Sequence, residues 1–277
     1  MVQVIPTNTV MLVATQTQEP TAVFTIAPPA APTAIPTITA TPSPTYTPTP
    51  TNTPTPSPTA TKEACNQRIP NSDDLLVIVT QKFGLSQAYK PADLVPIAPH
   101  ISHEVTLGYP TEVRAEILDP LVEMINDMLA LGLQPTIISS YRSYATQQTA
   151  YNKWLIEEPE RADELSAQPG HSEHQLGTTV DFGSKNLHDY IDDSFDENLQ
   201  FHTYFYKTPE GAWLLENGHL YGFTLSYPRE AQEITGFFYE PWHYRYVGVE
   251  NATILHDNNI SLTEYLLNQD PVPCIAD

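Results

Sequence analysis

The sequence predicts an α+β domain, in which a small, largely antiparallel sheet has helices packed on one side, preceded by a disordered Thr/Pro-rich segment. Two observations favour this class. From about residue 63 onward, stretches with apolar residues at helical spacing alternate loosely with short runs rich in β-branched and aromatic residues. The short runs lack the length that strands of a doubly wound parallel sheet have, so we expect hairpin-like pairing instead.

The expected helices and strands follow one another along the second half of the chain. TEVRAEILDPLVEMINDMLALG (111–132) has apolar residues three and four positions apart, which predicts a helix; Pro120 is expected to kink it and Gly132 to end it. Next come a strand at 135–141, a helix at 144–158, a strand at 178–183, a polar loop or lid at about 186–204, a helix at 209–223 that ends near Gly218 or Gly222, a strand at 242–248 and a helix at 261–269.

The N-terminal segment has a different composition. Residues 1–60 contain 17 Thr and 13 Pro, and Glu19 is the only charged residue before Lys62. Proline fixes φ and lacks a backbone donor, so this segment is expected to be an extended, polyproline-like tether. A glycosylated stalk is the alternative for such a composition. We therefore divide the chain into a disordered linker at 1–62 and a folded domain at 63–277.

Charge and hydropathy restrict the partners of the domain. From Lys62 onward the chain carries all 12 basic residues and 32 of its 33 acidic residues, a net charge near −20, which argues against a nucleic-acid partner. The apolar run VMLVA (10–14) is far shorter than a membrane span, and no basic segment precedes it. Because a Thr/Pro-rich tether at an N-terminus usually connects a domain to something else, we expect an anchor or signal upstream of this sequence. We therefore expect a monomer located outside the cytoplasm at the cell envelope.

The two cysteines stand near the two ends of the folded region. Cys65 and Cys274 are predicted to form a disulfide, because the termini of a domain often lie close together and an even cysteine count suits an oxidising compartment. Two unrelated thiols are the alternative. Neither cysteine has a neighbouring Cys or His, so neither resembles a zinc ligand.

Two segments supply metal-ligand chemistry where strands would otherwise be apolar. In PGHSEHQLGTTVDF (169–182), His174 precedes a glycine turn and Asp181 lies in the strand that follows; in FFYEPWHYRYVG (237–248), an aromatic strand carries His243. Imidazole nitrogen and carboxylate oxygen suit Zn²⁺, and three protein ligands leave a position for water, as in catalytic zinc sites. Without the second segment, a capping histidine and a surface aspartate would explain the first equally well.

Two further polar residues complete the candidate site. Glu240 lies three positions before His243, where a general base beside a metal-activated water is expected, and Pro241 stiffens the link between them. The alternative is a surface ion pair on an edge strand. Arg142 follows a predicted strand directly, which favours an anion clamp for a substrate carboxylate or an oxyanion over a structural salt bridge.

Taken together, three segments resemble the VanY-like zinc D-alanyl-D-alanine carboxypeptidases: SSYRSYATQQTAY, PGHSEHQLGTTVDF and YEPWHYRYVG. GAWLLENGHLYGFTLSYP (211–228) and YKPADLVPI (89–97) are also similar to segments of that family, so the resemblance covers roughly residues 75–250. It implies a fold of the Hedgehog/DD-peptidase type.

The resemblance also assigns roles to residues. It implies that His174, Asp181 and His243 bind one zinc ion per chain, that Glu240 is the catalytic base, and that Arg142 contacts the substrate or the transition state. Gln147 and Ser172 match family positions near the substrate. Thr179 departs from the family, which usually has a small residue there, but it is not a ligand position.

The resulting hypothesis is a zinc D-alanyl-D-alanine carboxypeptidase that removes the C-terminal D-amino acid from peptidoglycan stem peptides. An L,D-carboxypeptidase or an endopeptidase would use the same ligands and base, so the motifs do not separate these activities. A non-catalytic wall-binding or zinc-sensing module would keep the ligands and lose the base or the clamp. Glu240 and Arg142 are both present, which favours an enzyme.

Overall fold

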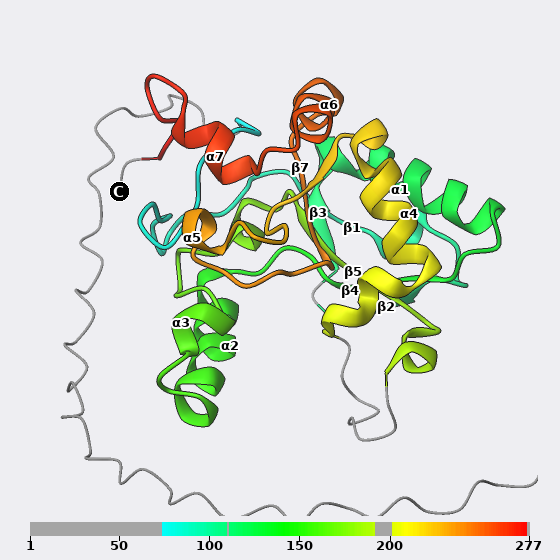
Figure 1. Cartoon of the computed structure of the whole chain (residues 1–277), viewed down its shortest axis with the longest axis horizontal. Coiled ribbons are helices and arrows are strands. Elements are labelled where there is room, and N and C mark those ends of the chain that lie inside the picture. Colours follow the sequence, from blue (N-terminus) through cyan, green and yellow to red (C-terminus); the bar gives the residue numbers. More distant parts are fainter. Residues whose placement is uncertain (1–73, 110, 192–200, 276–277) are drawn as a thin grey trace, which may run out of the picture. The chain divides into compact units, whose positions relative to one another are not determined.

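The computed structural model describes residues 74–109, 111–191 and 201–275 (Figure 1), so the predicted tether and Cys65 lie outside the described residues. The β-strands are β1 (Leu94–Pro96), β2 (Thr106–Leu107), β3 (Glu112–Arg114), β4 (Pro135–Ser139), β5 (Thr179–Ser184), β6 (Phe223–Leu225) and β7 (His243–Tyr246). The α-helices are α1 (Ala115–Ala130), α2 (Tyr144–Glu157), α3 (Ala162–Leu165), α4 (Pro209–Asn217), α5 (Gln232–Thr235), α6 (Val249–Asn258) and α7 (Leu262–Leu267). Short 3₁₀ helices are η1 (Ala98–His100), η2 (Glu173–Leu176), η3 (Leu187–Tyr190), η4 (Thr203–Lys207) and η5 (Gly218–Tyr221).

A five-stranded sheet forms the centre of the domain, in the order β2-β4-β5-β7-β6. Only the β2–β4 pair is parallel; β4–β5, β5–β7 and β6–β7 are antiparallel. A separate antiparallel pair joins β1 to β3. The predicted α+β class with a small, largely antiparallel sheet is therefore confirmed.

The two faces of the sheet have different chemistry because side chains alternate along a strand. On β5, Val180 and Phe182 are fully buried in the main hydrophobic core, and on β7 Tyr244 joins the same core. Helices α1 and α4 cover this face and contribute Ile117, Leu121, Met124, Ile125, Met128 and Leu214 to the core. The alternate residues of β5 and β7 therefore face the opposite side of the sheet, away from α1.

The helix predicted at 111–132 begins later than expected. Residues 112–114 form β3 and pair with β1, and the helix starts at Ala115. Pro120 lies inside α1, and the helix ends at Ala130. Gly132 has the left-handed φ of 79° and follows the helix as its stop, as the sequence predicts.

Other predicted elements differ at their ends. The strand predicted at 135–141 stops at Ser139, and Tyr141 bonds instead through its backbone N–H to the carbonyl of Glu112. The helix predicted at 209–223 divides into α4 and η5, after which Gly222, with φ 85°, turns the chain into β6. The polar stretch at 186–204 contains η3 and the start of η4, and its residues 192–200 lie outside the described part of the chain.

A second, smaller core lies where the beginning and the end of the described chain meet. Helices α6 and α7 bury Leu255, Leu262 and Leu266 against Ile78 and Phe83. The backbone N–H of Ile78 donates to the carbonyl of Pro273 at 2.7 Å, which joins the two ends directly. Among the helices that the structure describes, none combines the length and the hydrophobicity that a membrane crossing needs.

Candidate active site

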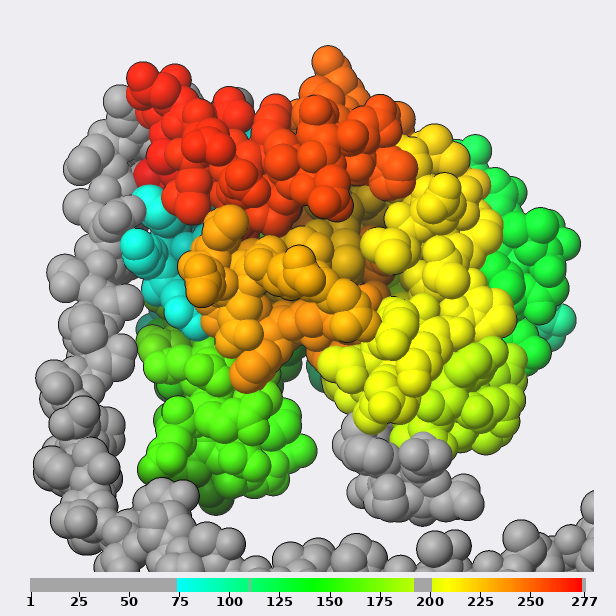
Figure 2. All heavy atoms as spheres, viewed as in Figure 1, coloured from blue at the N-terminus to red at the C-terminus, as the bar shows by residue number. Residues whose placement is uncertain are grey.

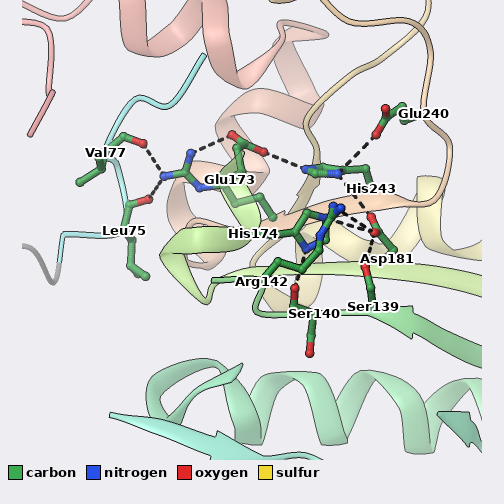
Figure 3. A network of polar contacts seen from close by, with 11 residues as sticks. Leu75, Val77, Ser139, Ser140, Arg142, Glu173, His174, Asp181, Glu240 and His243 are labelled. Carbon is green, nitrogen blue, oxygen red and sulfur yellow. Dashed lines mark hydrogen bonds and ion pairs between the residues drawn. The ribbon is translucent and has the colours of Figure 1, made fainter. Parts of the chain in front are cut away.

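Three neighbouring strands and one short helix deliver the candidate site to the face of the sheet opposite α1 (Figure 3). Asp181 of β5 pairs in register with His243 of β7 on one side and with Ser139 of β4 on the other. His174 comes from η2, which is followed by Gly177 just before β5. The register between strands therefore brings residues from distant parts of the sequence to one point.

The three predicted ligand residues meet with their donor atoms side by side. One ligand atom from each of His174, Asp181 and His243 lies within 4.8 Å of the others, and all three residues are buried. His174 Nε2 lies 3.0 Å from Asp181 Oδ2, and His243 Nδ1 lies 3.3 Å from Asp181 Oδ1. The two imidazole rings meet edge to face, with centroids 4.9 Å apart.

The far nitrogen of each imidazole has its own hydrogen-bond partner. His174 Nδ1 donates to the carbonyl oxygen of Ser140 at 2.7 Å, and His243 Nε2 donates to Glu173 Oε2 at 3.0 Å. These two bonds leave His174 Nε2 and His243 Nδ1 as the ring nitrogens that face Asp181. Metal-binding histidines are typically oriented in this way by a carbonyl or carboxylate behind the ring.

A buried ion pair supports the His243 side of the site. Glu173 accepts from Arg245 Nη1 at 2.8 Å, and Arg245 Nη2 donates to the backbone carbonyls of Leu75 and Val77 at 2.8 and 2.6 Å. Arg245 is fully buried and Glu173 is 3% exposed. His243 is thereby linked, through two side chains, to the first described segment of the chain.

Burial and neighbouring charges shift the pKa values of these groups in opposite directions. Burial lowers the pKa of His174 to about 4, and the Arg142 cation acts in the same direction. Burial also opposes charge on His243, but hydrogen bonds to Asp181 and Glu173 outweigh it and raise the pKa of His243 to about 9. For Glu173, burial is outweighed by the Arg245 cation, and the pKa falls to about 2.

Glu240 stands beside the three ligand residues. Its Oε2 lies 3.4 Å from His243 Nδ1, and its side chain is 18% exposed, so it keeps access to the solvent. The backbone N–H of His243 donates to the carbonyl of Glu240, which closes a tight turn with Pro241 as its second residue. Burial raises the pKa of Glu240 to about 7, which suits a group that must exchange a proton near neutral pH.

Arg142, in the segment after β4, also lies close to the three ligand residues. Its Nη2 lies 3.8 Å from Asp181 Oδ2, and its backbone N–H donates to the carbonyl of His174 at 3.2 Å. Its Nε is buried and has no hydrogen-bond partner among the described residues. The guanidinium therefore has one unused donor near the candidate metal position.

A cleft of about 760 Å³ opens in front of these residues. In Figure 2 it is the notch between the green α2–α3 region and the yellow-to-orange surface of η4 and residues 227–242. Gln147 and Ser172 both line it and are buried. Gln147 Nε2 donates to the carbonyl of Ala167 at 2.6 Å, whereas its buried Oε1 has no hydrogen-bond partner among the residues that the structure describes.

Comparison with known proteins identifies the family. The family model for VanY, D-alanyl-D-alanine carboxypeptidase, matches residues 110–249. The chain belongs to the VanY family. The putative carboxypeptidase YodJ of Bacillus subtilis (strain 168) is 33% identical over 200 residues, which make up 72% of this chain and 69% of YodJ.

Solved structures agree with this assignment. The LdcB LD-carboxypeptidase, whose structure concerns peptidoglycan recognition, has a TM-score of 0.60 and 32% identity, and the match covers 72% of this chain and 88% of LdcB. A variant of the vancomycin-resistance D,D-pentapeptidase VanY in complex with Zn(II) has a TM-score of 0.53 and 29% identity, covering 69% and 98% of the two chains. This VanY-family chain is a metallopeptidase, and zinc is its cofactor.

The sequence motifs predicted five residues for metal binding or catalysis, and the structure brings them close together: Arg142, His174, Asp181, Glu240 and His243. It also places beside them two residues that the motifs did not reveal. Glu173 and Arg245 were not predicted. Arg245 stands two positions after His243 in an aromatic strand, so the period of two was a signal that it shares the face of the ligand. Glu173 gave no such signal, because its partner lies 72 positions away in the chain.

The predicted disulfide is only partly within the described residues. Cys274 is buried, at 4% exposure, and is not a free thiol. Cys65 lies outside the described residues, so its pairing with Cys274 stays a prediction.

Proposed function

We propose that this VanY-family chain is a zinc-dependent D-alanyl-D-alanine carboxypeptidase that removes the terminal D-amino acid from peptidoglycan stem peptides. The observation that carries the proposal is the convergence of His174, Asp181 and His243 with Glu240 at the base of an open cleft. Three donors suited to zinc and an acid with a pKa near 7 are the groups that hydrolysis of a peptide bond requires.

The donors fit a zinc ion. His174 Nε2 is a buried atom without a hydrogen-bond partner among the described residues, a condition that a bound cation would relieve. We infer that His174 binds through Nε2, His243 through Nδ1 and Asp181 through its carboxylate. When bound, zinc supplies a Lewis acid that polarises the scissile carbonyl and activates a water molecule.

Glu240 moves the proton in this proposal. Its Oε2 accepts a proton from the attacking water as the oxygen forms its bond to the carbonyl carbon. The same carboxyl then gives the proton to the leaving amine nitrogen as the carbon–nitrogen bond breaks. The raised pKa favours this exchange, because a carboxyl with a pKa near 7 both accepts and donates readily at neutral pH.

Arg142, Gln147 and Ser172 hold the substrate in this proposal. Arg142 lines the cleft, and its guanidinium suits the terminal carboxylate of the peptide or the developing oxyanion. Gln147 Oε1, at the wall of the cleft, is a buried acceptor without a partner in the described part of the chain, and it suits an N–H of the peptide.

Cleavage of an L,D bond is the second candidate, since the LdcB LD-carboxypeptidase is a relative of similar fold and identity. Purified zinc-loaded protein is incubated with a stem pentapeptide ending in D-Ala-D-Ala and, separately, with a tetrapeptide ending in an L,D bond. Loss of D-alanine from the pentapeptide alone supports the D,D activity. Loss from the tetrapeptide alone would replace it with the L,D activity, and cleavage at an internal bond would indicate an endopeptidase.

Glu240→Ala separates an enzyme from a non-catalytic binding module. The variant is expected to retain zinc and to lose about 10²- to 10⁴-fold in turnover, the usual contribution of a general base. Glu233→Ala, an exposed acid on α5, is the control and should keep full turnover. Equal turnover of the two variants would contradict the role of Glu240.

We also propose the setting in which the enzyme acts. The folded domain spans 63–277, works as a monomer outside the cytoplasm at the cell envelope, and is carried on the Thr/Pro-rich segment 1–62. A Cys65–Cys274 disulfide suits that oxidising location. Non-reducing and reducing peptide maps of the secreted protein test the disulfide, because only the oxidised form would yield a linked peptide pair.

A further inference from the structure

Arg229 lines the cleft and takes no part in the hydrolysis proposed above. It is exposed, and its guanidinium carbon lies 4.3 Å from the ring centroid of Tyr206 and 4.3 Å from that of Tyr239. The two rings are 6.2 Å apart and tilted by 58°, so they form a cradle for the cation. Cation–π contacts hold a guanidinium in place without neutralising its charge.

The charge of Arg229 sets it apart from the other basic residues of the cleft. Each of the other three Lys and Arg side chains that line the cleft has a nitrogen 3.8 Å from a carboxylate oxygen. The pairs are Arg142–Asp181, Lys153–Glu157 and Arg161–Glu164. No acidic side chain of the described residues forms an ion pair with Arg229. In a domain with a net charge near −20, a held but unpaired arginine in a substrate cleft indicates an anionic ligand.

The backbone places this cation on the same wall as Glu240. The N–H of Glu240 donates to the carbonyl of Tyr227 at 3.2 Å, so the segment that leads to Arg229 runs beside the segment that carries the base. Tyr239, one half of the cradle, directly precedes Glu240 in the chain. A peptide whose scissile bond lies at Glu240 therefore has Arg229 within reach of a few extended residues, at about 3.3 Å each.

We propose that Arg229 is a second anion contact of the cleft, which binds a free carboxylate carried by a residue preceding the scissile bond. The planar guanidinium suits bidentate recognition of a carboxylate and cannot recognise the corresponding amide in the same way. Substrates of this class are stem peptides with an unamidated acidic residue, such as a diaminopimelyl residue. The inference rests on the proposed function, because it assumes that a peptide occupies the cleft.

The test compares two peptides that differ only in this carboxylate. A diaminopimelyl stem pentapeptide and its side-chain amide are titrated into zinc-loaded Glu240→Gln protein, in which hydrolysis does not interfere with binding. The free acid is expected to bind about tenfold more tightly, the lower range for a charged hydrogen bond, because Arg229 is exposed. Adding Arg229→Gln should remove the difference, and Arg229→Lys should restore only part of it.

Arg161→Gln is the matched control. Arg161 is also an arginine of the cleft stacked on an aromatic ring, Phe238, at 5.2 Å, but it is paired with Glu164. Discrimination lost with Arg229→Gln and kept with Arg161→Gln supports the inference. Equal binding of acid and amide by the parent protein, or loss of discrimination with Arg161→Gln alone, would overturn it. Failure of the proposed function is a separate result, absence of hydrolysis by the protein that retains Glu240.

Discussion

The contact between Glu173 and His243 provides a sharp test of the site. Glu173→Gln keeps the size of the side chain but offers one oxygen and one NH₂ group in place of two carboxylate oxygens. Glu173 now accepts from two donors, His243 Nε2 at 3.0 Å and Arg245 Nη1 at 2.8 Å. Glutamine can satisfy only one of them, and its own NH₂ group must face the other.

The expected loss can be estimated for both possible orientations of the glutamine. If the NH₂ group faces His243, the imidazole loses the acceptor that orients it, and zinc affinity should fall about 10- to 100-fold, or roughly 1.4–2.7 kcal/mol. If it faces Arg245, a fully buried cation loses its partner, a change that costs about 3–5 kcal/mol of folding free energy at most sites. Because Arg245 also keeps two backbone acceptors, we expect the lower end.

Two measurements on one set of variants separate these effects. Zinc affinity is measured by competition with a fluorescent chelator, and the free energy of unfolding of the metal-free protein by urea titration. The double variant Glu173→Gln/Arg245→Met should regain part of the stability, since no cation remains unpaired. It should also regain zinc affinity, because the glutamine oxygen is then free to accept from His243. Glu164→Gln, which loses only an exposed pair with Arg161, is the control. Glu173→Gln protein with both zinc affinity and the free energy of unfolding unchanged would refute the reasoning.

Two further predictions concern pH and packing. In the metal-free protein His243, with a pKa of about 9, carries a positive charge at neutral pH, whereas His174, with a pKa of about 4, is neutral. Zinc binding should therefore displace one proton, from His243. Apparent zinc affinity, measured by chelator competition, should therefore rise about tenfold per pH unit between pH 6 and 8 and level off above pH 9. A hundredfold rise per pH unit, or no rise, would contradict these protonation states of His174 and His243. Phe182→Ala should lower the free energy of unfolding by about 3–5 kcal/mol, because the ring is fully buried against Phe223 and Tyr244, and a loss below about 1 kcal/mol in urea would be inconsistent with that packing.

Local features were the part of the fold that the sequence predicted well. The helical spacing before Gly132 predicted α1 and its end, because a glycine in left-handed geometry stops a helix wherever it occurs. The helix after Arg142 was predicted nearly to the residue, and Ser143 caps it by accepting from the N–H of Thr146 at 3.1 Å. Short strands such as β2 and β3 were not predicted, since two or three residues carry too little periodicity to be recognised.

The sequence by itself determined which groups are available for chemistry: two histidines, an aspartate, a glutamate beside a proline and an arginine after a strand, in segments that resemble one family. Only the tertiary structure decided that they meet, because the pairing of β5 with β7 sets Asp181 opposite His243 and no local pattern encodes that register. It alone also decided which ring nitrogens face the metal position, through the Ser140 carbonyl and Glu173 behind the rings. Hydrogen bonds and charges act through space, so a residue such as Arg229 acquires its meaning only from the side chains that folding brings around it.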